Sequence, residues 1–249
     1  MILTLQSSAE LSACRDELKQ RGLDFTEPSR TRIWRLLFKL RYRTPLQLAD
    51  ELKSWDVARA LKVIETYAPD RQTPILDMGC FNSEILYGLH ALGYRRLHGC
   101  DLNPLCRWMP FWTQIRYTWA DLTKTPYPDR SFGVLTCMSV IEHGVPIEPL
   151  AAEVARLLQP GGIFLFTTDY DATGQNHEID PAFRVFGQSW RIFNPETLSG
   201  LIGQFQQAGF TLLDPSRNDA SHQDCPVHWK DQDYTFVMVG LRAPQKAGG

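Results

Sequence analysis

The stretch PILDMGCFNSEILYGLHALGYRRLHGCDLNP, residues 74–104, decides the fold of this chain. A short apolar run, Ile75 and Leu76, ends at Asp77, and a loop and a helix-patterned segment follow before a second strand ends at Asp101. This is half of a strand–helix–strand unit with one carboxylate at the end of each strand. Because ligands of open α/β sheets bind beyond the carboxyl ends of the strands, the stretch predicts a site for a nucleoside-bearing cofactor.

The alternation of strands and helices continues toward the C-terminus. We expect strands at 74–78, 96–100, 115–119, 131–138, 161–168, 210–214 and 233–242. We expect helices at 83–92, 104–112, 147–158 and 195–208. This pattern predicts a parallel sheet covered on both faces. Only a polar loop joins the last two strands, so the final strand can pair antiparallel. The predicted fold class is α/β, a doubly wound seven-stranded sheet that is mostly parallel, with the last strand antiparallel.

The first 70 residues have a different pattern. Apolar residues recur at helical spacing within 10–20, 31–40 and 46–67. We therefore expect an N-terminal helical cap over 1–70, followed by a Rossmann-like domain over 71–249.

Composition narrows the class of protein further. Hydrophobic residues make up 43% and charged residues 22% of the 249 residues, which is typical of a soluble globular protein. The net charge of −2 provides no strong field for nucleic acid. The six cysteines form no Cys-x-x-Cys pair, so we expect reduced thiols in the cytoplasm and no metal site. The N-terminus does not have the pattern of a signal peptide, and no apolar run approaches the roughly 18 residues that span a bilayer. The oligomeric state stays open.

The glycine pattern of the first loop favours one kind of cofactor over another. Gly79 lets the backbone turn tightly and approach a ligand closely. A dinucleotide fingerprint would need two more glycines, at the positions of Phe81 and Glu84. Glutamate at the start of a helix would repel a pyrophosphate, so NAD and FAD are disfavoured. A nicotinamide oxidoreductase stays as an alternative.

Two later carboxylates can contact a nucleoside. Asp101 lies 22 residues after Gly79 at the end of the second strand, where it can accept both ribose hydroxyls. Its alternative role is the N-cap of the following helix. Asp121 follows the third strand, and it or its neighbours' backbone can reach the exocyclic amine of an adenine, or it can simply form a turn.

Four segments together resemble the class I S-adenosylmethionine-dependent methyltransferases. They are ILDMGC (75–80), HGCDLNP (98–104), ADLTKTPYPDRSFGVLTCMSVIEHG (120–144) and LLQPGGIFLFTTD (157–169). The family usually has Asp-x-Gly-x-Gly-x-Gly in the first loop, whereas this chain retains only Gly79 and has Phe81 and Ser83 at the later glycine positions. The resemblance implies S-adenosyl-L-methionine as the cofactor.

The resemblance also implies which residues hold that cofactor. The first strand end and its loop would hold the methionine part, the second strand end the ribose, and the third the adenine, with the end of the fourth strand lining the methionine side. The implied residues are Asp77, Gly79, Cys80, Asp101, Leu102, Asp121, Leu122, Met138 and Ser139.

An oxygen acceptor must also lose a proton, which requires a positioned base. His143 follows the fourth strand and is the first candidate, although it can instead be a structural histidine at the edge of the site. A long polar insertion after the fifth strand supplies Asp169, Tyr170 and His177 as alternative bases or acceptor ligands.

These inferences predict a methyltransferase that modifies an oxygen of a small molecule or saccharide. One alternative is a non-catalytic S-adenosylmethionine-binding protein, which the altered glycine loop motivates. Another is a small-RNA 2′-O-methyltransferase, which looks similar around Glu142 and His143. Those enzymes use a metal-binding glutamate at the position of Ser139, and its absence argues against RNA as the acceptor.

Overall fold

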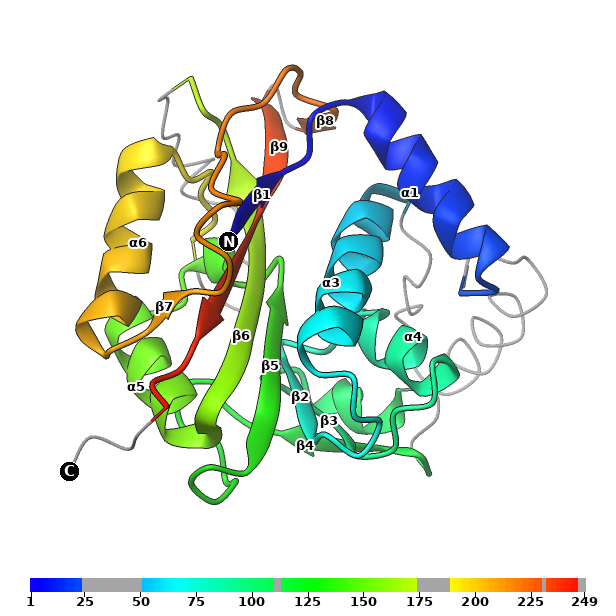
Figure 1. Ribbon diagram of the computed structural model, residues 1–249, viewed down its shortest axis with the longest axis vertical. Helices are drawn as coiled ribbons and strands as arrows, with labels where there is room; N and C mark the ends of the chain where they lie inside the picture. Colours follow the sequence, from blue (N-terminus) through cyan, green and yellow to red (C-terminus); the bar gives the residue numbers. More distant parts are fainter. Residues whose placement is uncertain (24–50, 110–112, 174–188, 230–231, 246–249) are drawn as a thin grey trace.

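The computed structural model describes residues 1–23, 51–109, 113–173, 189–229 and 232–245. One twisted β-sheet forms its centre, and helices pack on both faces of the sheet (Figure 1). The strands are β1 (Ile2–Thr4), β2 (Ile75–Met78), β3 (Leu97–Asp101), β4 (Ile115–Trp119), β5 (Phe132–Met138), β6 (Leu158–Tyr170), β7 (Thr211–Leu212), β8 (Val227–Trp229) and β9 (Gln232–Arg242). The helices are α1 (Ser8–Gln20), α3 (Ser54–Tyr67), α4 (Ile85–Ala91), α5 (Ile147–Leu157) and α6 (Pro195–Gln207), with short 3₁₀ turns η1 (Glu51–Lys53), η2 (Pro104–Trp108) and η3 (Ile141–His143).

The strand order confirms the predicted fold class. Along the sheet the order is β1-β9-β6-β5-β2-β3-β4, and β7 and β8 also pair with β9. The strands from β2 to β6 are parallel to their neighbours, whereas β9 is antiparallel to β6. The described sheet has nine strands instead of the expected seven. The additional strands, β1 and β8, have three residues each, which is too short to give a clear alternation in the sequence.

Alternate residues of the central strands contribute to two separate hydrophobic cores. Ile75 packs with α1, α3 and α4, while its neighbour Leu76 packs on the opposite face with α5 and α6. Successive side chains of a strand point to opposite faces, so a strand covered on both sides must be apolar at nearly every position. All four residues of β2 are buried accordingly.

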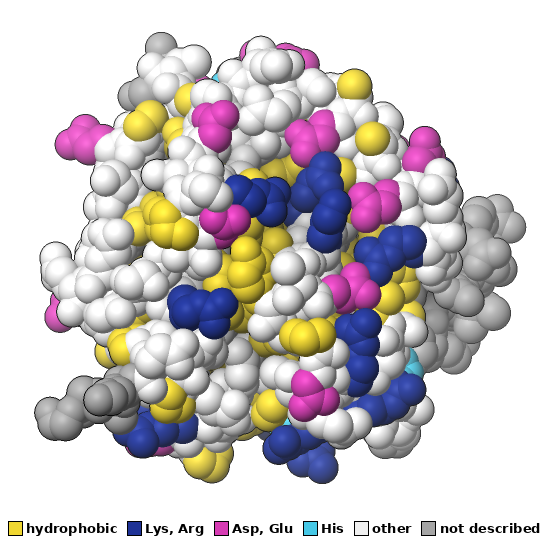
Figure 2. Space-filling model, viewed as in Figure 1, with side chains coloured by type: hydrophobic (Ala, Val, Ile, Leu, Met, Phe, Trp, Pro, Cys, Tyr) yellow, Lys and Arg dark blue, Asp and Glu magenta, His cyan; other side chains and the backbone are white. Residues whose placement is uncertain are grey.

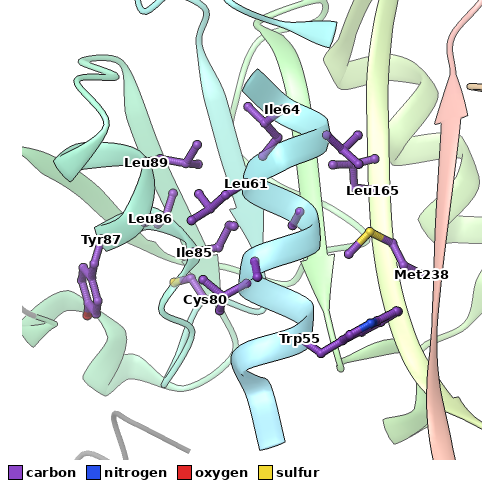
Figure 3. Packing of buried hydrophobic residues seen from close by; sticks show 14 of the residues in the cluster. Trp55, Leu61, Ile64, Cys80, Ile85, Leu86, Tyr87, Leu89, Leu165 and Met238 are labelled. Carbon is purple, nitrogen blue, oxygen red and sulfur yellow. The ribbon is translucent and has the colours of Figure 1, made fainter. Parts of the chain in front are cut away.

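Helix α3 fills the space between α4 and the sheet (Figure 3). Its apolar residues, among them Trp55, Leu61 and Ile64, recur at helical spacing and are fully buried. Figure 3 shows Leu61 facing the side chains of α4, while Trp55 extends toward Met238. This packing fixes the N-terminal end of α3 relative to the strand ends.

The N-terminal region departs partly from the sequence-based expectation. The helices expected within 10–20 and 46–67 are confirmed by α1 and α3, while the one expected within 31–40 lies outside the described residues. The expectation that the whole region is helical is wrong for Ile2–Thr4, which pair antiparallel with β9. Trp55 and Arg59 both bond the Glu10 carboxylate, which ties α3 to α1. Because both helices share a core with the sheet, the division at residue 70 stays a prediction.

Among the described residues, no helix combines the length and apolar character that crossing a bilayer requires.

Candidate cofactor and active site

A cavity of about 550 Å³ opens where several parallel strands end. Its walls come from the loops after β2, β3, β4 and β5 and from the start of α3. The lining residues are Lys53, Asp56, Val57, Gly79, Phe81, Asn82, Ser83, Glu84, Ile85, Asp101, Leu102, Leu122, Met138, Ser139, Val140, His143 and Val145. Seven of the residues expected from the sequence therefore share one cavity: Gly79, Asp101, Leu102, Leu122, Met138, Ser139 and His143.

The loop after β2 turns at Gly79 and again at Asn82. Gly79 has φ of 85° and donates its N–H to the Cys100 carbonyl at 2.8 Å. Asn82 has φ of 66°, a left-handed conformation that asparagine adopts more readily than most residues. The sequence analysis looked for glycines in this loop and did not single out Asn82. The tolerance of asparagine for the left-handed conformation is a local signal that could have identified it. The loop thus keeps a second left-handed turn without the later glycines.

Asp101 is held at the floor of the cavity by backbone groups. Its Oδ2 accepts from the Phe81 N–H at 2.8 Å, and its Oδ1 accepts from the Asn103 N–H at 2.7 Å. Burial raises the pKa of Asp101, while these two hydrogen bonds oppose the rise. A carboxylate has about four acceptor sites, so both oxygens can still accept from hydroxyls of a ligand.

Asp77 and Cys80 lie behind the cavity rather than on its wall. Asp77 is fully buried and accepts from Thr136 Oγ1 at 2.7 Å, while its Oδ2 has no hydrogen bond within the described structure. Burial raises the pKa of Asp77 to about 6. The Cys80 sulfur packs against β3, since a Cβ on Gly99 would lie 2.8 Å from it. The Cys80 thiol therefore does not face the cavity, and the Cys80 N–H and carbonyl are bonded within the chain, to the Cys100 carbonyl and the Ser83 N–H.

Of the three residues expected near the adenine, two have reached the cavity and one has not. Leu102 and Leu122 both line the cavity. Asp121 is exposed and does not line it. Its Oδ1 accepts from the N–H and the hydroxyl of Thr123, which forms the local turn that the sequence left open as an alternative.

A buried polar network joins the start of α3 to the ends of β5 and β6. Lys53 Nζ donates to Ser139 Oγ at 2.6 Å, and Ser139 Oγ donates to Asp56 Oδ2 at 3.1 Å. Thr167 Oγ1 donates to the same Asp56 oxygen at 3.2 Å. Ser139 itself has φ of 52°, a conformation rare for serine and frequent at functional sites. The sequence analysis did not identify Lys53 or Asp56, because nothing in the local pattern links them to the strand ends.

His143 lines the cavity, and the residue before it, Glu142, is buried. Burial, together with the positive charge of Lys53, lowers the pKa of His143 to about 4, so its imidazole is neutral at pH 7. Its Nδ1 is buried and has no hydrogen bond within the described structure. Burial and the neighbouring Asp169 raise the pKa of Glu142 well above its usual range.

The other candidate bases are less accessible. Asp169 is buried, and its Oδ2 accepts from the Trp190 indole N–H at 2.7 Å. Tyr170 is fully buried and belongs to the core on the α5 and α6 face. His177 lies outside the described residues.

A second cluster of polar side chains lies outside the cavity. Ligand atoms of Asp171, His222 and Cys225 lie within 4.8 Å of one another. His222 Nε2 accepts the Ala172 N–H at 2.9 Å, so in the neutral imidazole the proton sits on Nδ1. Neither ring nitrogen then has a lone pair free for a metal ion, and the cluster is better described as a hydrogen-bonded support of the chain after β6.

The match to known families agrees with this geometry. Residues 76–166 match the methyltransferase domain family, and this segment contains the cavity loops after β2, β3 and β5. The matched segment and the cavity together support a class I S-adenosylmethionine-dependent methyltransferase, with S-adenosylmethionine as the cofactor.

Curated relatives match only part of the chain. The sterol 24-C-methyltransferase erg-4 of Neurospora crassa is 28% identical over 122 residues, covering 47% of this chain and 31% of that protein. The malonyl-[acyl-carrier protein] O-methyltransferase of Halorhodospira halophila is 27% identical over 163 residues, covering 62% of this chain and 54% of that protein. The chain thus matches about a third to a half of the length of these relatives.

A solved structure shares the fold over nearly the whole length. The 1,6-didemethyltoxoflavin-N1-methyltransferase of Burkholderia thailandensis, with bound 1,6-didemethyltoxoflavin and S-adenosylhomocysteine, has a TM-score of 0.56 at 16% identity. The similarity covers 97% of this chain and 92% of that chain. At this identity the comparison establishes the fold.

Proposed function

We propose that this chain transfers a methyl group from S-adenosylmethionine to an oxygen atom of a small molecule or saccharide. The observation that carries the proposal is the placement of a neutral imidazole, that of His143, in the same cavity as Asp101 and Gly79. The strand edge that would bind the cofactor and the residue that would accept the proton thus line one cavity.

The cavity fits the cofactor at several points. Asp101 would accept the ribose hydroxyls, and Leu102 and Leu122 would pack against the adenine. The backbone at Gly79 and Ser139, which both line the cavity, would contact the amino-acid end. When bound, S-adenosylmethionine supplies a methyl group on a positively charged sulfur. Asp121 would reach the adenine amine only through the backbone next to it, since its carboxylate holds Thr123.

His143 supports oxygen as the acceptor atom. A hydroxyl must lose its proton during transfer, and a positioned base typically accelerates such a step by about 10²–10⁴-fold. The names of the relatives do not select the atom, because they describe transfer to carbon, oxygen and nitrogen. His143 is neutral at pH 7, so a ring nitrogen can take up the proton, but its lowered pKa also makes it a weaker base than an ordinary imidazole.

The face of the molecule drawn in Figure 2 has no concentration of basic side chains among the residues that it colours. Figure 2 shows one face on which basic and acidic side chains are interspersed around a band of hydrophobic ones. A binding surface for nucleic acid would instead concentrate Lys and Arg on one face. A small neutral or weakly charged acceptor is compatible with this mixed surface.

Two measurements test the proposal. Purified protein with methyl-labelled S-adenosylmethionine is offered hydroxyl compounds, saccharides, amines and thiols, and labelled products are identified by mass spectrometry. We expect label on a hydroxyl oxygen, and label on amines or protein side chains alone would contradict the choice of oxygen. Calorimetry with S-adenosylhomocysteine tests the cofactor site separately. Asp101→Ala should abolish detectable binding, whereas Asp16→Ala, at an exposed position of α1, should leave it unchanged.

A further inference from the structure

We propose that Lys53 and Asp56 bind the two charged groups at the amino-acid end of the cofactor, with Lys53 on the carboxylate and Asp56 on the ammonium. The inference rests on the proposed function and assigns a charge-specific subsite within it. Both residues lie outside residues 76–166, the segment matched by the family model, so they are specific to this chain's N-terminal region.

The position of the pair in the cavity is the first argument. Lys53 and Asp56 line the same cavity as Gly79 and Ser139, which belong to the loops after β2 and β5. Ser139 bonds directly to both members of the pair. The nucleoside contacts are proposed for Asp101, the last residue of β3, so the charged pair marks the end of the cavity that remains for the amino acid.

The charges of the pair are the second argument. Lys53 Nζ lies 3.7 Å from Asp56 Oδ2. An α-amino acid carries an ammonium and a carboxylate on one carbon. When such a group is placed antiparallel to the Lys53–Asp56 pair, four charges alternate in sign around a ring. Asp56 is buried, so these attractions act in surroundings of low polarity and are stronger than they would be in water.

The rigidity of the pair is the third argument. Asp56 Oδ2 is fixed by two hydroxyls, that of Ser139 in the loop after β5 and that of Thr167 in β6. Lys53 reaches over the ring of Phe236, with Nζ 4.3 Å from the ring centroid, and about a third of its side chain remains exposed. The carboxylate is therefore already in place before a ligand binds, while the ammonium can adjust to it. Groups held in advance lose less entropy on binding.

A consequence distinguishes this subsite from a purely structural ion pair. The affinity for ligands that carry the amino-acid end should depend on Lys53 and Asp56. The affinity for ligands that carry only the nucleoside and the sulfur should not. S-adenosylhomocysteine has the amino-acid end, and 5′-methylthioadenosine lacks it. The ratio of their dissociation constants therefore reports on Lys53 and Asp56.

The experiment is calorimetric titration of the full chain and its variants with both compounds. We expect Lys53→Met and Asp56→Asn each to weaken the binding of S-adenosylhomocysteine by about 10- to 100-fold. This factor corresponds to the usual free energy of a charge-assisted hydrogen bond. Binding of 5′-methylthioadenosine should change by less than about twofold. Lys62→Met, at an exposed position of the same helix, is the matched control and should change neither constant.

Each outcome has a defined meaning. If the variants weaken the binding of both ligands equally, or of neither, the pair is structural and the inference is wrong. The proposed cofactor site is not affected by this outcome. If the wild-type chain binds 5′-methylthioadenosine as tightly as S-adenosylhomocysteine, the inference is also wrong. If it binds neither compound, the proposed function fails. Thermal unfolding of each variant identifies loss of folding, and Lys53→Met decides the question if Asp56→Asn does not fold, because Lys53 is partly exposed.

Discussion

Gly79 and Val140 approach so closely that no side chain fits between them: a Cβ on Gly79 would lie 2.4 Å from Val140 Cγ2. Gly79 follows β2 and Val140 follows β5, two neighbouring parallel strands, so the contact joins the two loops that line one end of the cavity. The φ of 85° at Gly79 adds a second constraint, because side chains other than hydrogen are strained in this region. The loop conformation therefore depends on glycine at this position.

Replacement of Gly79 by alanine should destabilise the chain and weaken cofactor binding. The left-handed backbone costs about 1–2 kcal/mol for a residue with a Cβ, and the collision with Val140 adds to this cost. Chemical denaturation and calorimetry with S-adenosylhomocysteine measure the two effects. Gly203→Ala is the control: a Cβ there meets nothing within 4 Å, and in the interior of α6 it should stabilise the chain by about 0.5–1 kcal/mol. An unchanged stability of Gly79→Ala would show that the loop relaxes without cost.

Substitutions of Asn82 should separate backbone conformation from side-chain chemistry. With φ of 66°, Asn82→Gly keeps the loop conformation and should bind the cofactor as well as the wild type does. Asn82→Val puts a β-branched side chain in the left-handed region and should lower the free energy of unfolding by about 1–2 kcal/mol. Denaturation curves of the two variants provide the comparison. Equal stability of the glycine and valine variants would contradict this account.

The buried carboxyl of Asp77 should make stability depend on pH. Its pKa is about 6 in the folded chain and 3.8 by its ordinary value, so between these values the folded state binds more protons than the unfolded state. The contribution of Asp77 to the free energy of unfolding is thus highest below the unfolded pKa of 3.8, falls as the pH rises through about 6, and stays low at pH 7. Asp77→Asn removes this titration and should gain up to about 3 kcal/mol relative to the wild type between pH 4 and 7.

Denaturation at a series of pH values checks this prediction. Asp121→Asn, the same exchange at an exposed position, is the matched control. Parallel curves for the wild type and Asp77→Asn would show that the buried carboxyl does not titrate differently in the two states.

The pH dependence of the activity should reflect the lowered pKa of His143. Because its pKa is about 4 in the folded chain, the imidazole is already neutral at pH 6, and kcat/KM should stay level from pH 6 to 8 instead of falling near 6.5. His143→Ala should reduce kcat by about 10²-fold or more with little change in the KM for S-adenosylmethionine. His90→Ala, on α4, is the control. A His143→Ala variant that keeps its kcat but unfolds more easily would identify a structural histidine.

The same group should act on stability in the opposite direction to Asp77. Unfolded His143 has its ordinary pKa of 6.5, so between pH 4 and 6.5 the unfolded state binds more protons than the folded state. Its contribution to the free energy of unfolding therefore rises with pH across this range and is complete above it. His143→Gln should remove this rise, which the pH series of denaturation curves would detect. An unchanged slope would mean that His143 is accessible to protons in the folded chain.

Local sequence patterns predicted the central part of the fold. Apolar runs such as Ile75–Met78 are buried on both faces of a parallel sheet, and such strands have few alternatives. The strand ends then placed Gly79, Asp101, Leu102, Leu122, Met138, Ser139 and His143 in one cavity, because the carboxyl ends of parallel strands share one edge of the sheet. For these residues position along the chain was sufficient.

Side-chain direction was not predictable in the same way. Cys80 follows Gly79 in the loop, but its sulfur packs against β3, and the carboxylate of Asp121 closes its own turn. Both outcomes depend on the exact path of a loop, which spacing alone does not specify.

The sequence by itself thus determined the sheet, its reversed last strand and the acidic strand ends, since each is a property of a few consecutive residues. Only the tertiary structure decided that Asp56 meets Ser139 and Thr167, which lie 83 and 111 residues away along the chain. Contacts of this kind arise when α3 packs on the sheet, and no local periodicity records which polar residues the packing brings together.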